Sequence, residues 1–282
     1  MYFHNITSKT LLLALTLGLT HLAPLHAGEY EGIHTLDEAI RAANQGAVEA
    51  QNSLAMIYRD GLGVTRDYKA ALKWFRMAAD KGHAEAQYNL GMMLHDGKGG
   101  PKNDAEALKW LRKSADQGMA EAQFALSEVY RTAKDGSNND QEAMRWLRRS
   151  SEQGFAEAQY YLGICLRDGK DCPQDATEAA GWLRKAADQE FAKAQSALGT
   201  MLATGQGGTK DLIQAVMWLQ LAADQGDPAA SKKLTQLGQE MSREQMAQAK
   251  DLARRWSPPN LKPISPPPGP SGGATQHPKK AE

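Results

Sequence analysis

Residues 83–118 have the sequence HAEAQYNLGMMLHDGKGGPKNDAEALKWLRKSADQG, which is one copy of a unit that recurs every 36 residues. The period is visible in single columns, and the clearest is a tryptophan column: Trp74, Trp110, Trp146, Trp182 and Trp218. Five copies follow one another without insertion between about residues 48 and 228. A period of 20–50 residues is typical of a solenoid, in which each unit buries its apolar face by stacking on its neighbours.

Each unit carries the pattern of two helices joined by a glycine-rich turn. In the first copy Ala50, Leu54 and Ile57 form the apolar stripe of an amphipathic helix that begins near residue 48. The second helix begins at a column of capping residues: Asp67, Asn103, Asn139, Asp175 and Asp211. It ends at a recurrent glycine, which favours the left-handed conformation found at helix ends. The pattern predicts an all-α solenoid of antiparallel helix pairs.

The tryptophan column predicts a ladder of structural side chains packed between successive hairpins. A small-residue column in the first helix points to close approach of a neighbouring backbone: Ala55, Gly91, Ser127, Gly163 and Gly199. Both columns belong to the core of the solenoid. Neither column indicates a catalytic or binding site.

The two ends of the chain differ from the repeats. Residues 1–27 have the pattern of a signal peptide, with Lys9, an apolar run over Leu11–Leu19 and a small residue at Ala27. Residues 28–47 are expected to cap the first repeat, and residues 229–256 to form capping helices after the fifth. Residues 257–282 are rich in proline and glycine, which predicts a disordered tail. An exported protein, periplasmic or secreted, with no stable membrane insertion after signal cleavage is therefore expected.

The segments AEAQYNLG, DGKG and AEALKWLRKSADQG in the second copy resemble the Sel-one-like repeat family, a 36-residue relative of the tetratricopeptide repeats. The resemblance is strong over residues 48–226 and weak over 229–256. It implies right-handed superhelical stacking of the hairpins and a role as a protein-binding adaptor. The family is not defined by a catalytic residue, so the resemblance implies none here.

Composition and motifs argue against several classes of function. The chain has 33 Lys+Arg and 33 Asp+Glu, a balance that gives no general attraction to nucleic acid. His83 and His95 are not at metal-ligand spacing, and no cysteine cluster accompanies them. No Gly-x-Ser-x-Gly elbow between a predicted strand and helix occurs in the sequence, and no Ser-x-x-Lys pair occurs either. We therefore expect no enzyme activity, no metal and no cofactor.

The only two cysteines, Cys165 and Cys172, lie in the first helix and the following turn of the fourth copy. In an oxidising compartment the short separation allows a disulfide between them. The alternative is one buried and one exposed free thiol. The sequence leaves both open.

A candidate partner-binding face lies on the side of the first helices opposite the core stripe. In an ordinary surface helix the columns through Asn52, Met56 and Arg59 would be polar, yet here they carry aromatic, aliphatic and arginine side chains. Tyrosine and arginine dominate the hot spots of binding surfaces, and methionine adapts to varied partners. By resemblance, they would line the concave side of the solenoid and bind a protein or peptide. The candidates are Tyr88, Met92, Phe124, Glu128, Arg131, Tyr160, Ile164 and Arg167. The alternative is that these aromatic residues pack against the neighbouring hairpin.

The sequence favours a non-enzymatic protein- or peptide-binding adaptor of the cell envelope. Two alternatives stay open, namely a cell-wall-associated glycan binder or hydrolase modulator, and a secreted effector that acts on host proteins. The sequence names no partner.

Overall fold

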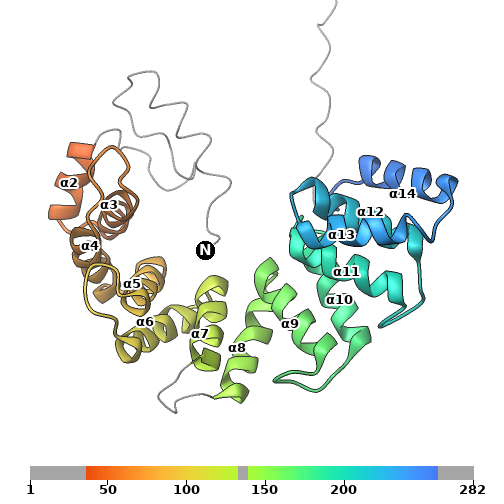
Figure 1. Ribbon diagram of the computed structural model, residues 1–282. Coiled ribbons are helices and arrows are strands. Elements are labelled where there is room, and N and C mark those ends of the chain that lie inside the picture. The colour runs from red at the N-terminus through yellow and green to blue at the C-terminus, as the bar shows by residue number, and fades with distance from the viewer. Residues whose placement is uncertain (1–35, 133–138, 260–282) are drawn as a thin grey trace, which may run out of the picture.

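The computed structural model describes residues 36–132 and 139–259, and within these residues the chain is entirely α-helical. The signal peptide predicted over residues 1–27 and nearly all of the predicted tail lie outside the described residues, as does the turn of the third repeat at 133–138. The described part forms an open arc of stacked hairpins (Figure 1). The prediction of a right-handed α-solenoid of antiparallel helix pairs is confirmed.

Five hairpins make the body of the arc, and each contains two helices of 12 or 13 residues. The pairs are α3 (Val48–Asp60) with α4 (Tyr68–Asp80), α5 (Ala84–Asp96) with α6 (Asp104–Asp116), α7 (Ala120–Thr132) with α8 (Asp140–Glu152), α9 (Ala156–Asp168) with α10 (Ala176–Ala187), and α11 (Ala192–Thr204) with α12 (Leu212–Asp224). In Figure 1 the first helices α3, α5, α7 and α9 line the inside of the arc, and their partners lie outside.

The second helix of every hairpin begins as its sequence predicts. Side-chain oxygens of the capping column accept hydrogen bonds from backbone N–H groups of the first turn, for example Asn103 from Glu106 and Asp211 from Gln214, at 3.0 and 2.9 Å. These bonds satisfy donors that a helix leaves unpaired. Capping therefore fixes where each second helix starts.

The small column of the first helix sets the spacing within a hairpin. A Cβ added to Gly163 would lie 2.7 Å from Cγ of Leu183 on α10, and one added to Gly199 would lie 2.7 Å from Cγ of Leu219 on α12. A side chain at either position would push the two helices apart. The predicted close approach is confirmed, and it is an approach between the two helices of one hairpin.

A buried glutamine joins each hairpin to the one before it. Gln123, for example, donates from Nε2 to the carbonyl oxygen of Ala115 at the end of the preceding hairpin, and its Oε1 accepts from Gln153 of its own hairpin. The first bond recurs in all five repeats at 3.0–3.2 Å. The second recurs in the last four at 2.6–2.9 Å. The column thus pairs buried polar groups at every junction.

The tryptophan column lies in the second helices, and its members are buried or half-buried. Trp110, Trp146 and Trp218 are at most 8% exposed, and all five lie against the apolar clusters between hairpins. Cations cover several of the rings, among them Lys113 over Trp110 and Lys185 over Trp182, at 4.1 and 3.8 Å from the ring centroids. A Trp–Trp ring contact among the described residues joins Trp218 to Trp256, outside the column, with centroids 5.4 Å apart.

Additional helices flank the five hairpins. The helix α2 (Leu36–Asn44) packs on α3, and the pair α13 (Pro228–Leu237) and α14 (Arg243–Arg255) packs on α12. The start of α14 has a capping box, because Ser242 and Gln245 exchange side-chain to backbone hydrogen bonds. These helices cover apolar surface that the first and last hairpins would otherwise expose.

Candidate protein-binding face

An aromatic strip extends from α7 across α9 to the start of α11. It consists of Phe124, Phe155, Tyr160, Tyr161 and Phe191, whose rings touch in sequence. Ring centroids are 5.6 Å apart for Phe124–Phe155, 5.4 Å for Phe124–Tyr161, 5.2 Å for Tyr160–Tyr161 and 5.4 Å for Tyr160–Phe191. These are the tilted and edge-on arrangements that aromatic rings favour. The strip thus runs from α7 across α9 to the residue that precedes α11.

The rings of the strip are only partly covered by protein. Tyr161 is 37% exposed, and the other four are half-buried with one side against the core of the fourth and fifth hairpins. Burial raises the pKa of the Tyr160 and Tyr161 phenols above their ordinary value. The strip thus combines anchoring in the core with apolar surface that remains accessible.

Two of the candidate residues from the sequence, Phe124 and Tyr160, belong to the strip. Tyr88 and Met92 lie one repeat earlier and pack against the cluster of α6 and α7. Burial raises the pKa of the Tyr88 phenol to about 12, helped by the nearby carboxylates Glu121 and Glu157. Tyr88 and Met92 are therefore half-buried residues beside the strip.

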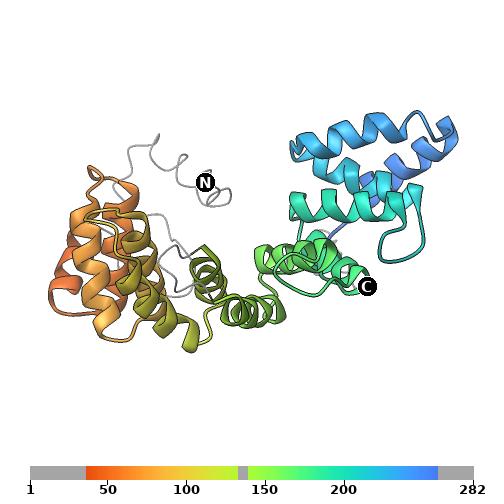
Figure 2. The same ribbon diagram turned by 60° about the horizontal axis from the view of Figure 1, so that its bottom comes forward.

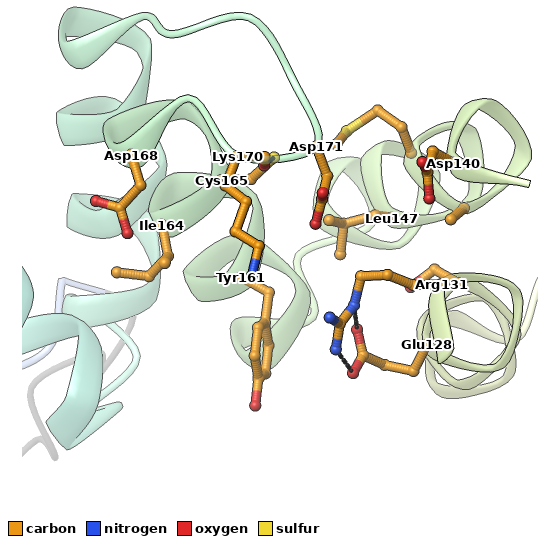
Figure 3. A pocket seen from close by; sticks show the side chains of 13 residues that line it. Glu128, Arg131, Asp140, Leu147, Tyr161, Ile164, Cys165, Asp168, Lys170 and Asp171 are labelled. Carbon is orange, nitrogen blue, oxygen red and sulfur yellow. Dashed lines mark hydrogen bonds and ion pairs between the residues drawn. The ribbon is translucent and has the colours of Figure 1, made fainter. Parts of the chain in front are cut away.

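The other four candidates lie at or beside a hollow where the third and fourth repeats meet. Glu128 and Arg131 of α7 and Ile164 of α9 line it, and Arg131 donates two hydrogen bonds to the Glu128 carboxylate, at 3.1 and 2.8 Å (Figure 3). Arg167 does not line the hollow; it forms a two-bond pair with Asp168 at 2.6 and 3.0 Å. That pair lowers the pKa of Asp168.

One part of the predicted face is wrong. Asn52 is 1% exposed and does not face outward, because its side chain donates to the Glu85 carboxylate of the next repeat at 2.9 Å. The first helix of the following repeat covers the residue. Polar character alone did not reveal this contact.

Sequence reasoning missed Phe155, Tyr161 and Phe191. Tyr161 occupies a column filled elsewhere by small or polar residues: Ser53, Asn89, Ala125 and Ala197. Phe155 and Phe191 precede the helices α9 and α11, in a column that holds Ala47, His83, Met119 and Asp227 elsewhere. The signal in the sequence was that these three positions hold aromatic residues where the other repeats hold different residue types.

The two cysteines form a disulfide in the structure, with their Cα atoms 6.1 Å apart. The bond ties the turn of the fourth repeat to its own helix α9. Cys165 also lines the hollow. Within residues 36–132 and 139–259, no group of three or more His, Cys, Asp or Glu side chains is placed to hold a metal ion. No helix in the same residues is long and apolar enough to cross a membrane.

Comparison with known proteins places the repeats in a family. The Sel1 repeat matches five consecutive segments, residues 48–83, 84–119, 120–155, 156–191 and 192–227. The chain belongs to the Sel1 repeat family. Sel1 repeat proteins are generally protein-interaction scaffolds, and the repeat is typically non-catalytic. A search of curated proteins gave no match.

Solved structures of Sel1 repeat proteins from bacteria resemble the chain. A Sel1 repeat protein from Oxalobacter formigenes is 34% identical with a TM-score of 0.67, over 72% of this chain and 58% of that one. A protective antigen present in uropathogenic Escherichia coli strains, which displays an SLR fold, is 29% identical with a TM-score of 0.51, over 77% of this chain and 55% of that one. The chain thus spans somewhat more than half the length of each.

Proposed function

We propose that this Sel1 repeat protein is an exported, non-enzymatic adaptor that binds a protein or peptide on the inside of its arc. The observation that carries the proposal is the aromatic strip. Five touching rings between α7 and the start of α11 keep part of their apolar surface uncovered. Tyrosine is enriched among the few residues that carry most of the binding energy at protein interfaces, and aromatic side chains bury a large apolar area.

The arc provides a surface long enough for an extended segment. Successive first helices follow one another along the inside of the arc (Figure 2 shows the same helices from another side). A chain that crosses several repeats would contact the rings in turn, and specificity would come from which repeats carry them. The third and fourth repeats contribute all five rings of the strip, so we place the strongest binding there.

A peptide selection tests the proposal. The full chain is used to select peptides from a random displayed library, in parallel with a Phe124→Ala/Tyr161→Ala variant. We expect a peptide consensus with the wild-type chain and none with the variant at an unchanged melting temperature. Equal enrichment on both proteins would place the binding elsewhere. Absence of any consensus, together with retention of the chain on isolated peptidoglycan, would favour a glycan binder.

The proposal also includes the organisation of the chain. We assign residues 1–27 to a signal peptide, 28–47 to an N-terminal cap, 48–228 to the repeats, 229–256 to a C-terminal cap and 257–282 to a tail. Mass spectrometry of the mature protein should give an N-terminus close to Gly28. An intact Met1 on a cytosolic species would contradict the export.

A further inference from the structure

The turns of the third and fourth repeats carry aspartate, Asp135 and Asp171, where the other three repeats have their second turn glycine. The second turn glycine is Gly63, Gly99 and Gly207 in the first, second and fifth repeats, and Asp171 takes this place in the fourth. Asp171 adopts the left-handed conformation, with φ of 66°, although it is not a glycine. A residue other than glycine in this region carries a conformational cost, and such residues are often found at functional sites.

The substitution has a consequence for packing. A Cβ on Gly99 would collide with the backbone of Tyr68 at the start of α4, and one on Gly207 with the backbone of Ala176 at the start of α10. In both repeats the turn therefore lies directly on the second helix of the preceding hairpin. The equivalent residue for Asp171 is Asp140, at the start of α8. Because Asp171 has a Cβ, its turn must stand away from α8.

A hollow of about 220 Å³ lies at this place. Its apolar wall is made by Ala143, Met144 and Leu147 of α8 and by Tyr161 and Ile164 of α9. The Cys165–Cys172 disulfide holds the turn on the side of α9. Pockets that enclose whole small molecules measure about 300–1,000 Å³. The hollow is smaller, so it suits one side chain of a larger partner.

The charges around the hollow select the kind of side chain. Its lining includes four carboxylates, from Glu128, Asp140, Asp168 and Asp171, and two cations, from Arg131 and Lys170. Glu128 is paired with Arg131, and Asp168 with Arg167 outside the hollow. Asp140 and Asp171 form no ion pair within the described residues, and the Asp171 carboxylate points into the hollow in Figure 3. Lys170 is the lining cation without a carboxylate partner of its own, and Asp171 also acts on the Arg131 guanidinium, whose pKa it helps to raise.

We propose that the hollow is an anchor site for one arginine or lysine side chain of the protein partner. The inference rests on the proposed function and names the chemistry of the partner. The aliphatic stem of the side chain would lie against Leu147 and Ile164, and its charged group would meet Asp140 and Asp171. The ring of Tyr161, which lines the hollow and belongs to the aromatic strip, offers a face for cation–π contact.

Lys170 affects how strongly the hollow would bind a cation. Its side chain extends from the turn toward Tyr161 in Figure 3, into the space that a partner's cation would use. Lys170 therefore competes with the partner. Its removal should strengthen the binding of a basic side chain, whereas removal of a lining carboxylate should weaken it.

A titration with N-acetyl-arginine amide tests the site without the natural partner. Amide NMR shifts of the full chain are followed, with N-acetyl-citrulline amide as an uncharged probe of the same shape. We expect saturable shifts concentrated at residues 140, 161, 164, 170 and 171, and binding of the citrulline compound at least about tenfold weaker. A single exposed charge pair contributes up to about fivefold in affinity, and two carboxylates act together.

Variants separate the contributions of charge and backbone. Asp171→Asn keeps a residue that tolerates the left-handed conformation and should weaken arginine binding about threefold to fivefold, as should Asp140→Asn. Lys170→Gln should strengthen it about threefold by the same reasoning. The matched control is Glu190→Gly, which relieves another left-handed residue, with φ of 63°, away from the hollow. That variant should bind as the wild type does.

The outcomes distinguish the anchor site from the proposed function. Equal shifts with arginine and citrulline probes, or binding unchanged in both Asp variants, would overturn the anchor site. A peptide consensus on the aromatic strip without a basic residue would overturn it as well, and leave the adaptor function intact. Arginine binding without any selected peptide would contradict the adaptor function and keep the site.

Discussion

At the scale of single residues, the glutamine column explains how hairpins are joined, and one repeat breaks its pattern. In the last four repeats the glutamine Oε1 accepts a hydrogen bond from a glutamine 30 residues later. In the first repeat that position is Lys81, whose ammonium instead donates to the carbonyl oxygen of Gly46 at 2.7 Å. The Oε1 atom of Gln51 is buried without a partner in the described structure. A buried unpaired acceptor lowers stability.

Lys81→Gln should therefore stabilise the protein. The new amide would donate to Gln51 Oε1 as Gln117 does to Gln87, and the gain in the free energy of unfolding should be about 1 kcal/mol. Urea unfolding of the full chain measures it. The control is Lys69→Gln, which makes the same charge change at an exposed position and should leave stability within about 0.5 kcal/mol of the wild type. Equal effects of the two variants would show that charge, and not the hydrogen bond, is responsible.

Glu157, a half-buried residue of α9, predicts a pH-dependent effect. Burial raises the pKa of its carboxyl above the ordinary value near 4.5, and Lys193 opposes the shift. The folded protein thus holds the proton more tightly than the unfolded chain. The stabilising contribution of the protonated form is complete below the unfolded pKa and is lost as the pH rises through the folded pKa.

Replacement of Glu157 by Gln removes the loss of stability that ionisation of this carboxyl causes. We expect a melting temperature about 1–3 °C higher than the wild type at pH 7 and no difference near pH 3.5, where both side chains are neutral. Thermal unfolding at the two pH values measures the effect. Glu121→Gln, in the same column one repeat earlier, is the comparison. A gain that persists at the acidic pH would show that packing, and not ionisation, is the cause.

At the scale of helices and turns, the repeat columns predicted most of what the structure contains. Capping residues predicted where second helices begin, and small residues predicted close helix contact, because both depend on neighbours at fixed positions within one repeat. The hollow could not be predicted in this way. It depends on how the turn of one repeat meets a helix of the previous one, and Asp171 alone gave no sign of Asp140 beside it. Asn52 was misplaced because its burial also depends on a contact between repeats, here with Glu85 of the next repeat.

The disulfide of the fourth repeat is an element-scale feature with its own test. Alkylation of the native protein without reductant should label neither Cys165 nor Cys172. Because the closed loop is short, reduction should lower the free energy of unfolding by only about 2 kcal/mol. A Cys165→Ser/Cys172→Ser variant should match the reduced protein. Labelling of both thiols in freshly isolated protein would exclude the bond.

At the scale of the whole molecule, stability should be distributed along the arc as a series of neighbour contacts. Trp218 is 2% exposed and touches Trp256 at the end of α14, with the Arg184 guanidinium 5.8 Å from its ring centroid. It therefore packs both within the fifth repeat and against the helices that follow it. Trp74 in the first repeat is only half-buried.

Trp218→Ala should cost about 3–5 kcal/mol, and Trp74→Ala less, because less of that ring is buried. Hydrogen exchange should show where the loss falls. We expect α10 to α14 to lose protection in the Trp218 variant and α3 to α6 to keep it. Uniform loss along the chain would mean that the arc unfolds as a single cooperative unit.

The central claim is that the aromatic strip is a recognition surface and not merely part of the core. In the sequence, the column of Phe124 and Tyr160 was compatible with both a binding surface and packing against the next hairpin, and the half-buried rings do both. Only a measurement that follows stability and binding together separates them. Tyr88, beside the strip and packed on α6 and α7, provides the internal comparison.

Phe124, Tyr160 and Tyr88 are each changed to Ala, and the melting temperature is measured together with affinity for a peptide selected on the wild-type chain. Phe124→Ala and Tyr160→Ala should lose about 1–2 kcal/mol of binding free energy with little change in melting temperature. Tyr88→Ala should mainly lower the melting temperature. Large losses of stability in all three variants, with affinity unchanged in the folded fraction, would contradict the account.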